Sequence, residues 1–475
     1  MSEQLGITVK KSENFSEWYN QVVLKSELAD YAAIKGFMVI RPLGYAVWEN
    51  IMKAFDGMIK KLGHKNTYFP SLIPEKFLHK EAEHFKGFVP EAFIVTHSGN
   101  NKLEERLVVR PTSETIMYDS YARWIRSWRD LPLLLNQWNN VLRAEIKATK
   151  LFLRTSEFLW QEGHTVHATK EEADKEVITI LELYKKIAEE YLAIPVIAGR
   201  KSEMEKFAGA LYTTAIEALM PDGRALQAGT SHNLGQNFAK AFDIKFLDKD
   251  GQNKYAWQTS WGISTRLIGG MIMTHSDDKG LVLPPKIAPT HAVVIPIKFN
   301  EEEKVLKEAM SIKTKLEDAN LNVELDDRNE YTPGWKFNEW ELKGVPVRIE
   351  IGPKDLKKKE VVLVRRDTSQ KTSVKISKLV KEVESLLNDI QKNLYKKVKK
   401  FLEDETRIAK NYQEFKEVIV AGGFVKAGFC GSRQCEEKIK NDTTATSRVI
   451  PFKKEPVKCI ICNKDGEMTY FAKAY

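Results

Sequence analysis

The pattern of apolar residues changes near Pro289, and this change narrows the folds open to the chain. Beyond this point, short apolar runs alternate with segments in which apolar residues have helical spacing. Parallel strands need helical crossovers between them, so the alternation predicts a separate α/β domain with a partly parallel sheet. The expected elements are a strand at Ala292–Ile297, a helix at Glu301–Ala319, a strand at Asn322–Leu325, a helix near Trp335–Leu342 and a strand at Val345–Ile351.

The residues before Pro289 have the pattern of antiparallel strands and amphipathic helices. Phe93–His97 and Arg106–Val109 flank Ser-Gly-Asn-Asn-Lys, which is typical of a hairpin turn. Pro284-Pro285 and Pro289 predict the hinge to the next domain. Further expected elements are helices over Phe15–Ala33, Pro42–Leu62 and Glu171–Tyr191, and short strands at Ala256–Trp261 and Leu281–Leu283.

A third unit follows a lysine-rich helix expected over Ser373–Glu403, and it contains all four cysteines of the chain. Four residues separate the first pair, 23 separate the two pairs, and two separate the last pair. This spacing predicts a structural Zn²⁺ site with four thiolates and no open position for water, and so no catalysis there. The alternative is four reduced thiols without a metal. The candidate ligands are Cys430, Cys435, Cys459 and Cys462.

We therefore expect an α/β (α+β) protein of three domains, at residues 1–285, 286–400 and 401–475. No apolar run approaches the roughly 20 residues of a membrane span, and the N-terminus lacks a secretory pattern. Cysteines confined to one local cluster fit a reducing compartment. A cytoplasmic location is the resulting expectation.

The formal net charge of +9 comes from one region. Between Lys354 and Lys400 there are 15 Lys and Arg against 6 Asp and Glu, so the rest of the chain is nearly balanced. A solvated helix face is one explanation of such a run. A polyanion partner such as RNA is the other, since Arg365-Arg366 and Tyr395 accompany the lysines.

Four polar clusters stand within apolar sequence in the first domain: Arg110–Glu114, Arg143–Glu145, Gln227–His232 and Ser260–Arg266. A guanidinium keeps its charge at any working pH and binds phosphate or carboxylate oxygens two at a time. Surface ion pairs would account for any single arginine, but several arginines in apolar surroundings predict a shared pocket for phosphate chemistry.

Other catalytic motifs are missing from the sequence. It has neither a Gly-x-Gly-x-x-Gly turn nor a Gly-x-x-x-x-Gly-Lys loop, which removes dinucleotide and P-loop sites. It also lacks Gly-x-Ser-x-Gly and His-Glu-x-x-His, so hydrolase and zinc-protease activities have no support. We expect His164 and His167 to be hydrogen-bonded core or pocket residues rather than metal ligands.

The stretches RPTSET, VLRAE, FLRTSEFLWQEGHT, AGTSHNLGQNF and SWGISTRLIGG resemble a class II aminoacyl-tRNA synthetase, specifically the eukaryote-like and archaeal-like prolyl-tRNA synthetases. The resemblance covers essentially the whole chain. RPLGYAVWENI and the following strand to Pro70 resemble motif 1, Arg143–His164 motif 2 and Gly262–Gly270 motif 3. It implies an antiparallel catalytic core that dimerises through motif 1, an α/β anticodon-binding domain and a small C-terminal zinc-binding α/β domain.

The implied reaction joins the carboxylate of L-proline to the α-phosphate of ATP, releases pyrophosphate, and transfers the prolyl group to tRNA(Pro). Both reacting groups are anionic, so guanidiniums and Mg²⁺ must screen their repulsion. The family implies that Arg143 bridges the two groups and that Arg266 is its catalytic partner at the triphosphate. The implied ATP-binding residues are Arg143, Glu145, Arg154, Gln227, Thr230, Ser264 and Arg266; for Ser264, a hydroxyl bonded to the backbone is the alternative.

A proline pocket needs acceptors for a secondary ammonium and walls for a small ring. The family implies Thr112, Glu114, Arg143, Trp160, Glu162, His164, His232, Ser260 and Gly262. The related threonine enzyme uses a zinc held by cysteine and histidines, and this chain has no cysteine before Cys430. Between Arg154 and Gln227 there is also no room for a large editing insertion. Proofreading of alanine would then need a separate protein.

PGWKFNEWELKGVPVRIEIGPKDL resembles the anticodon-recognition segment. A terminal Tyr475 that docks near the catalytic domain is a family feature, and a frayed tail is the alternative. Two other functions stay open, a noncatalytic RNA-binding relative and a synthetase for serine or threonine. The candidate anticodon residues are Glu339, Glu341, Arg348, Glu350 and Asp355, with solvent-facing helix positions as the alternative.

Overall fold

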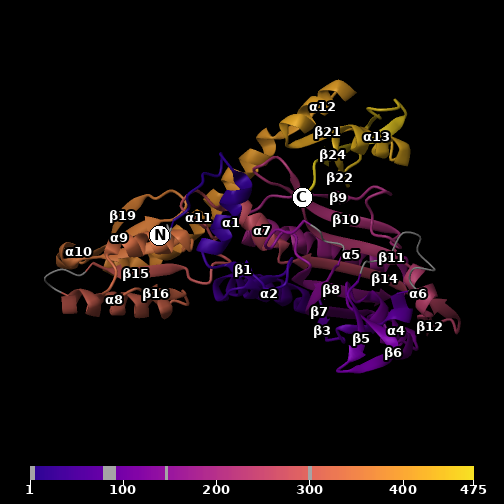
Figure 1. The fold of residues 1–475 in the computed structure, drawn as a ribbon, viewed down its shortest axis with the longest axis horizontal. Helices are drawn as coiled ribbons and strands as arrows, with labels where there is room; N and C mark the ends of the chain where they lie inside the picture. The colour runs from indigo at the N-terminus through magenta and orange to yellow at the C-terminus, as the bar shows by residue number, and fades with distance from the viewer. Residues whose placement is uncertain (1–5, 79–91, 145–147, 298–301) are drawn as a thin grey trace.

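The computed structural model describes the chain except for residues 1–5, 79–91, 145–147 and 298–301. Figure 1 shows three bodies: a large one built on a broad sheet, an orange α/β unit to one side, and a yellow unit above. The long helix α11 (Leu379–Asp404) runs from the orange unit to the yellow one. No described helix combines the length and apolarity that a membrane crossing requires.

The large body is organised by six strands that lie antiparallel to one another. Their order across the sheet is β9-β10-β11-β14-β8-β7. One face packs against helices α2 (Pro42–Lys61), α5 (Lys170–Lys186) and α7 (Arg266–His275), whose apolar side chains form the largest core. The strands are β7 (Leu133–Leu142), β8 (Glu157–His167), β9 (Ile197–Arg200), β10 (Tyr212–Leu219), β11 (Ala225–Gly235) and β14 (Trp257–Ser264).

Smaller elements surround this sheet. The predicted hairpin forms, and it joins a third strand in the order β4-β6-β5. α4 (Glu114–Trp124) begins within the RPTSET stretch and packs with α6 on a second core. The remaining elements are α1 (Phe15–Lys25), β1 (Ala29–Tyr31), β2 (Met38–Ile40), β3 (Lys65–Asn66), β4 (Leu72–Pro74), β5 (Ile94–Ser98), β6 (Asn101–Val109), α6 (Asn237–Phe242), β12 (Lys245–Leu247), β13 (Asn253–Tyr255) and the short helical turns Trp128–Asp130 and Ile187–Tyr191.

The second unit is an α/β domain with a sheet in the order β16-β15-β17-β18-β19. β15 pairs parallel to β16 and β17, and β18 and β19 are added antiparallel. The prediction of a partly parallel sheet is confirmed. Its elements are β15 (Ala292–Pro296), α8 (Glu302–Glu317), β16 (Val323–Leu325), α9 (Pro333–Leu342), β17 (Val347–Ile351), α10 (Pro353–Lys358), β18 (Glu360–Arg365), β19 (Lys371–Lys375) and the turn Ile376–Lys378 before α11.

The third unit extends the sheet of the large body. Strand β22 pairs with β9, so the strands of both units form one continuous sheet of 12 strands. α12 and α13 cover the added strands around a separate core. The elements are β20 (Thr406–Ile408), α12 (Tyr412–Ala421), β21 (Phe424–Phe429), α13 (Arg433–Thr443), β22 (Thr446–Pro451), β23 (Pro456–Lys458) and β24 (Asp465–Ala472).

Four predicted elements differ from the structure. The strand expected to run to Pro70 covers only Lys65–Asn66. The helix expected over Phe15–Ala33 ends at Lys25, and the chain then enters β1. Leu281–Leu283 is not a strand; the backbone N–H groups of its two leucines donate to the carbonyls of Leu342 and Gly344, and so hold it against the second unit. The helix expected over Ser373–Glu403 starts only at Leu379, because the residues before it complete β19 and a short turn.

Candidate active site

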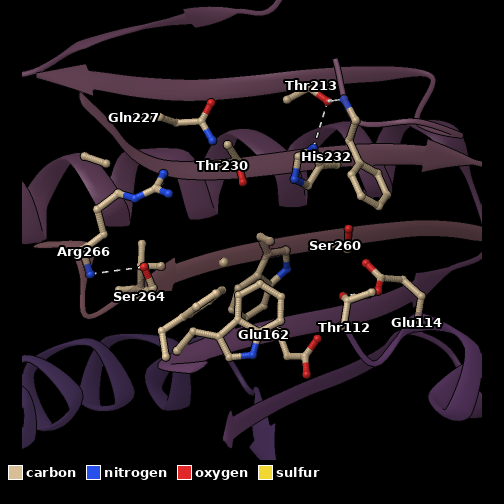
Figure 2. Close-up of a pocket in the computed structure, with 18 of the residues that line it drawn as sticks. Thr112, Glu114, Glu162, Thr213, Gln227, Thr230, His232, Ser260, Ser264 and Arg266 are labelled. Carbon is tan, nitrogen blue, oxygen red and sulfur yellow. Dashed lines mark hydrogen bonds between the residues drawn. The ribbon is translucent and has the colours of Figure 1, made fainter. Parts of the chain in front are cut away.

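A cavity of about 660 Å³ opens on the face of the large sheet away from α2 and α5. It is lined by β8, β11 and β14, by the residues that lead into α4, and by a loop at residues 205–207. Figure 2 shows Gln227, Thr230 and His232 on one wall, and Thr112, Glu114 and Glu162 opposite. Segments far apart in the sequence therefore meet in one pocket.

Thirteen of the residues expected at the site line this cavity. They are Thr112, Glu114, Arg143, Trp160, Glu162, His164, Gln227, Thr230, His232, Ser260, Gly262, Ser264 and Arg266. Arg154 is exposed and is not among the lining residues, although its charge acts on Arg266. Glu145 lies outside the described residues.

Two strands present their residues to the cavity by simple alternation. Trp160, Glu162 and His164 occupy every second position of β8 and share one face. Ser260, Gly262 and Ser264 do the same on β14.

On β11 the spacing is three residues, which would place Gln227 and Thr230 on opposite faces of a regular strand. The register shifts between Ile216 and Glu217 of β10, which face Gly229 and Gln227, so Ala228 is an extra residue. A β-bulge of this kind re-aims the neighbouring side chain. It accounts for why Gln227 and Thr230 both face the cavity in Figure 2.

One end of the cavity is acidic, and its carboxylates are already hydrogen-bonded by other groups of the protein. The carboxylate of Glu162, which is buried, accepts from the backbone N–H of Ser113 at 3.1 Å and from Asn139 Nδ2 at 2.7 Å. The hydroxyl of Ser113 also donates to it. Glu114, also buried, accepts from the hydroxyl of Thr112. The RPTSET segment is thus fixed by a carboxylate of β8.

His164 is hydrogen-bonded to one of the two carboxylates, Glu162, and is acted on by the charge of the other. Its Nε2 lies 3.1 Å from Glu162 Oε2, and its Nδ1 lies 3.1 Å from the hydroxyl of Tyr118. Burial disfavours charge on the ring, but the hydrogen bond to Glu162 and the charge of Glu114 raise the pKa of His164 above its ordinary value. Burial opposes charge on Glu162 as well, but His164 holds the pKa of that carboxyl below its usual range. Donor atoms of Glu114, Glu162 and His164 lie within 4.8 Å of one another.

His232 forms a neutral wall of the same end. Burial, followed by the charges of His164 and Lys201, lowers its pKa to about 3. Its Nδ1 lies 2.9 Å from the hydroxyl of Thr213, and its ring lies 5.0 Å from that of Phe207. Phe207 also lines the cavity but was missed by the sequence analysis, because an aromatic residue in an irregular loop follows no period that marks a face.

The other end is basic. The guanidinium of Arg143 lies 5.3 Å from the ring of Phe158 and 5.5 Å from that of Trp160, and its Nε donates to the carbonyl of Pro111 at 3.3 Å. Arg266 begins α7, where backbone N–H groups favour an anion. Burial and then the charge of Arg143 lower the pKa of Arg266 to about 10. This end therefore concentrates positive charge beside an open cavity.

Arg110, which opens the first predicted cluster, does not reach the cavity. Its side chain is buried and donates to the carbonyl and side-chain oxygens of Asn140 and to the carbonyl of Phe69, at 2.8 to 3.0 Å. Its role is to join the RPTSET segment to neighbouring backbone, so the prediction that all the clustered arginines share one pocket is wrong for Arg110.

The candidate anticodon residues lie in the second unit but divide into groups. Arg348, nearly buried, donates to Glu350 at 3.0 Å and to Glu341 at 3.3 Å, and its guanidinium lies 4.3 Å from the ring of Phe337. Glu339 instead accepts from Arg328 and from Lys343. Asp355 accepts from the backbone N–H of Gly352 and caps α10.

The four cysteines converge in the third unit. Sγ of Cys430 lies 3.7 Å from that of Cys435 and 3.6 Å from that of Cys462, and all four sulfurs lie within 4.8 Å of one another. Four thiolates at about 2.3 Å from a tetrahedral Zn²⁺ would be about 3.8 Å apart. The arrangement is compatible with that ion.

Comparison with known proteins accounts for the three units. Residues 94–275 match the tRNA synthetase class II core domain (G, H, P, S and T), residues 291–386 the anticodon binding domain, and residues 412–475 the prolyl-tRNA synthetase C-terminal domain.

Full-length relatives agree with these matches. The chain is 55% identical to the proline–tRNA ligase of Natranaerobius thermophilus, over 98% of this chain and 97% of that one. It is 54% identical to the enzyme of Cenarchaeum symbiosum, over 99% and 100%, and 50% identical to proline–tRNA ligase 2 of Bacillus cereus, over 100% and 99%. A pocket acidic at one end and basic at the other, together with these matches, shows that the chain belongs to the class II prolyl-tRNA synthetases.

Proposed function

We propose that the cavity described above is where this enzyme activates proline. As a prolyl-tRNA synthetase, the protein attaches proline to tRNA at the expense of ATP, for use in translation. The observation that carries the proposal is the opposite charge of the two ends of one cavity, which suits an amino acid at one end and a triphosphate at the other.

At the acidic end, the secondary ammonium of proline meets Glu114 and Glu162, whose oxygens lie within 4.8 Å of each other. Two carboxylates can accept both of its N–H groups. The ring then packs between Trp160 and the neutral pair His232 and Phe207. A charged His232 would repel the ammonium, so its low pKa serves binding.

At the basic end, Arg143 bridges the carboxylate of proline and the α-phosphate. Arg266 holds the distal phosphates, and Gln227, Thr230 and Ser264 complete the nucleotide site. Mg²⁺, which class II synthetases use with ATP, supplies further screening of phosphate charge. Gln227 and Thr230 line the cavity, and side-chain oxygens such as theirs are the ligand type that Mg²⁺ prefers.

Catalysis rests on charge stabilisation and alignment rather than on proton transfer, because the attacking carboxylate is already ionised. Attack of the carboxylate on the α-phosphate releases pyrophosphate and forms the prolyl-adenylate, which stays in the cavity. Its carbonyl is attacked by a hydroxyl of the terminal ribose of tRNA(Pro), and AMP leaves.

The test is proline-dependent ATP/pyrophosphate exchange with a panel of amino acids. We expect exchange with proline and at least about 100-fold less with serine or threonine, because neither fills a site built for a ring. A preference for serine or threonine would overturn the assignment to proline. Absence of exchange with every amino acid would instead favour a noncatalytic RNA-binding relative.

We also propose that the cysteine cluster holds a structural Zn²⁺. The distances between its sulfurs support this. Metal analysis of the purified protein should find about one zinc per chain, and a double variant Cys459→Ser and Cys462→Ser should find almost none. Negligible metal in both proteins would rule the site out.

Dimerisation through the motif 1 region is also part of the proposal. Exposed apolar residues gather around β1, β2 and α2: Tyr31, Ile34, Val39 and Tyr45 are 58, 64, 51 and 43% exposed. Apolar patches of this kind favour association. A dimer by sedimentation that is weakened by Tyr31→Asp would support this, whereas a monomeric wild type would contradict it.

For the second unit we propose contact with the anticodon through Arg348, Glu341 and Glu350, which form one cluster. Asp355 has a sufficient role as a helix cap and serves as the comparison. Arg348→Gln should raise the KM for tRNA and leave pyrophosphate exchange unchanged.

We retain residues 1–285, 286–400 and 401–475 as the proposed domains. The proposed location is the cytoplasm, where translation uses the product.

A further inference from the structure

The third unit touches the catalytic sheet through a close pairing of strands. Ile450 and Pro451 of β22 face Arg200 and Gly199 of β9. A Cβ at position 199 would lie 2.4 Å from the carbonyl oxygen of Ile450, so only glycine allows this approach. The two units are therefore in register at one defined point.

A buried ionic cluster lies at this junction. The guanidinium of Arg448, from β22, donates to both carboxylate oxygens of Glu217 on β10 at 3.0 to 3.2 Å. Lys201 Nζ lies 2.6 Å from the same carboxylate. The exposed fractions of the Arg448, Glu217 and Lys201 side chains are 6, 0 and 2%. One carboxylate thus holds two cations from two units.

Arg448 reaches this position because it occupies a bulge. Ser447 and Val449 of β22 face the consecutive residues Phe471 and Tyr470 of β24, so Arg448 is the extra residue between them. A bulge turns the extra side chain away from the regular alternation of the strand. The local backbone therefore directs the guanidinium across the junction toward the catalytic sheet.

Glu217 connects the cluster to the phosphate end of the cavity. It faces Gln227 across the β10–β11 pair, at the bulge formed by Ala228. Alternation along β10 places Glu217 on the same face as Thr213, which lines the cavity. Neither Glu217 nor Arg448 lines the cavity itself, so the pair acts from beside the cavity, on the same face of the sheet.

The charges of the cluster also affect the pKa of Arg266, which lines the cavity. Besides burial and Arg143, the charge of Glu217 raises and that of Arg448 lowers the pKa of Arg266. Losing Arg448 would leave Glu217 with Lys201 alone in a buried setting, which is costly and favours rearrangement. The carboxylate would then be free to leave its place beside Gln227.

We propose that Arg448, a residue of the C-terminal unit, is a positioning residue for the ATP end of the active site. It fixes the carboxylate of Glu217 and, through it, the bulge that turns Gln227 into the cavity. The inference rests on the proposed function of this cavity. It assigns the C-terminal unit a part in amino-acid activation that is separate from tRNA binding.

The test is pyrophosphate exchange without tRNA, with the KM for ATP and for proline measured for Arg448→Met and Arg448→Lys. We expect Arg448→Met to raise the KM for ATP about tenfold and to leave the KM for proline within about twofold, because the acidic end is held by other residues. Arg448→Lys, which keeps one charged donor, should restore most of the loss. Glu217→Gln should act like Arg448→Met, and the two changes together should be no worse than either alone.

Ser447→Ala is the matched control. The Ser447 hydroxyl lies at the same junction and bonds Ser202 and Glu436, but it belongs to neither the ionic cluster nor the cavity. It should lower the unfolding temperature without changing either KM. An Arg448→Met enzyme with a normal KM for ATP would overturn the proposal. So would equal increases in both KM values, or an ATP defect of the same size in Ser447→Ala. Exchange by the wild type tests the proposed function independently of these variants.

Discussion

The two ends of the active-site cavity carry opposite charge, and they are prepared for ligands in opposite ways. At the acidic end, Glu162 is already hydrogen-bonded to Ser113, Asn139 and His164 before any ligand arrives. At the basic end, Arg143 and Arg266 repel each other. Buried charge is therefore stabilised by hydrogen bonds within the protein at the acidic end, and it is stabilised only by a bound ligand at the basic end. Under the proposed function, the contrast implies a rigid amino-acid site and a nucleotide site that is completed by phosphate and Mg²⁺.

The largest effect should come from breaking the basic end. Arg143→Ala should lower kcat/KM for proline-dependent pyrophosphate exchange by about 1000-fold, because the repulsion between carboxylate and phosphate is then unscreened. Arg143→Lys keeps the charge but not the planar fork, so its kcat/KM should lie between those of the wild type and Arg143→Ala. Undiminished exchange by Arg143→Ala would refute its role.

Breaking the acidic end should have a smaller and selective effect. Glu162→Gln should raise the KM for proline by about 10- to 100-fold, the loss of one charge-assisted hydrogen bond of roughly 1.5–3 kcal/mol, with the KM for ATP almost unchanged. Glu157→Gln is the control, since Glu157 lies on the same strand but bonds Asn140 outside the cavity. A normal KM for proline in Glu162→Gln would contradict the assignment of proline to the acidic end of the cavity.

Ser264→Ala sharpens the account of the basic end. The Ser264 hydroxyl accepts from the backbone N–H of Arg266 at 3.3 Å and so supports the start of α7. Its loss should raise the KM for ATP by only about two- to fivefold, as for a neutral hydrogen bond of about 1 kcal/mol or less. A loss as large as that of Arg143→Ala would mean that Ser264 contributes far more to the nucleotide site than one neutral hydrogen bond.

The smallest effect is a pH dependence of stability at the acidic end. The pKa of His164 is raised above 6.5, so its contribution is complete below pH 6.5 and is lost as the pH rises through the raised value. The pKa of Glu162 is lowered below 4.5, so its contribution is present above pH 4.5 and is lost as the pH falls. The pair therefore stabilises most between these values.

Thermal unfolding of the wild type and of His164→Gln would measure this contribution. The advantage of the wild type in unfolding temperature should be largest near pH 5.5 and should shrink as the pH rises. An advantage that stays constant from pH 5 to 9 would show that His164 does not carry the charge assigned to it.

Much of the fold could be predicted from local pattern. Pro42–Leu62 was predicted as a helix and forms one over Pro42–Lys61, because its apolar spacing is helical and proline suits a first turn. The parallel part of the second sheet followed from strands separated by helices. The strand predicted at Leu281–Leu283 was wrong because this apolar segment is held against another unit without pairing in a sheet.

The candidate site was predictable where its functional side chains lie on regular strands. It was not predictable where it depends on contacts between residues that are far apart in the sequence. Glu162 and His164 occupy alternate positions of one strand, which a sequence shows directly. Arg110 has the same chemistry as Arg143, yet backbone carbonyls fill its donors, and no local pattern separates the two cases. The pairing of β22 with β9 joins residues some 250 positions apart, so Arg448 could not be connected with Glu217 in advance.

The most direct test of the central claim is a crystal structure with a non-hydrolysable analogue of prolyl-adenylate. The two-ended cavity predicts the pyrrolidine nitrogen within about 3 Å of carboxylate oxygens of Glu114 or Glu162, and the phosphate mimic beside Arg143. A reversed analogue, or one bound away from these residues, would contradict the account.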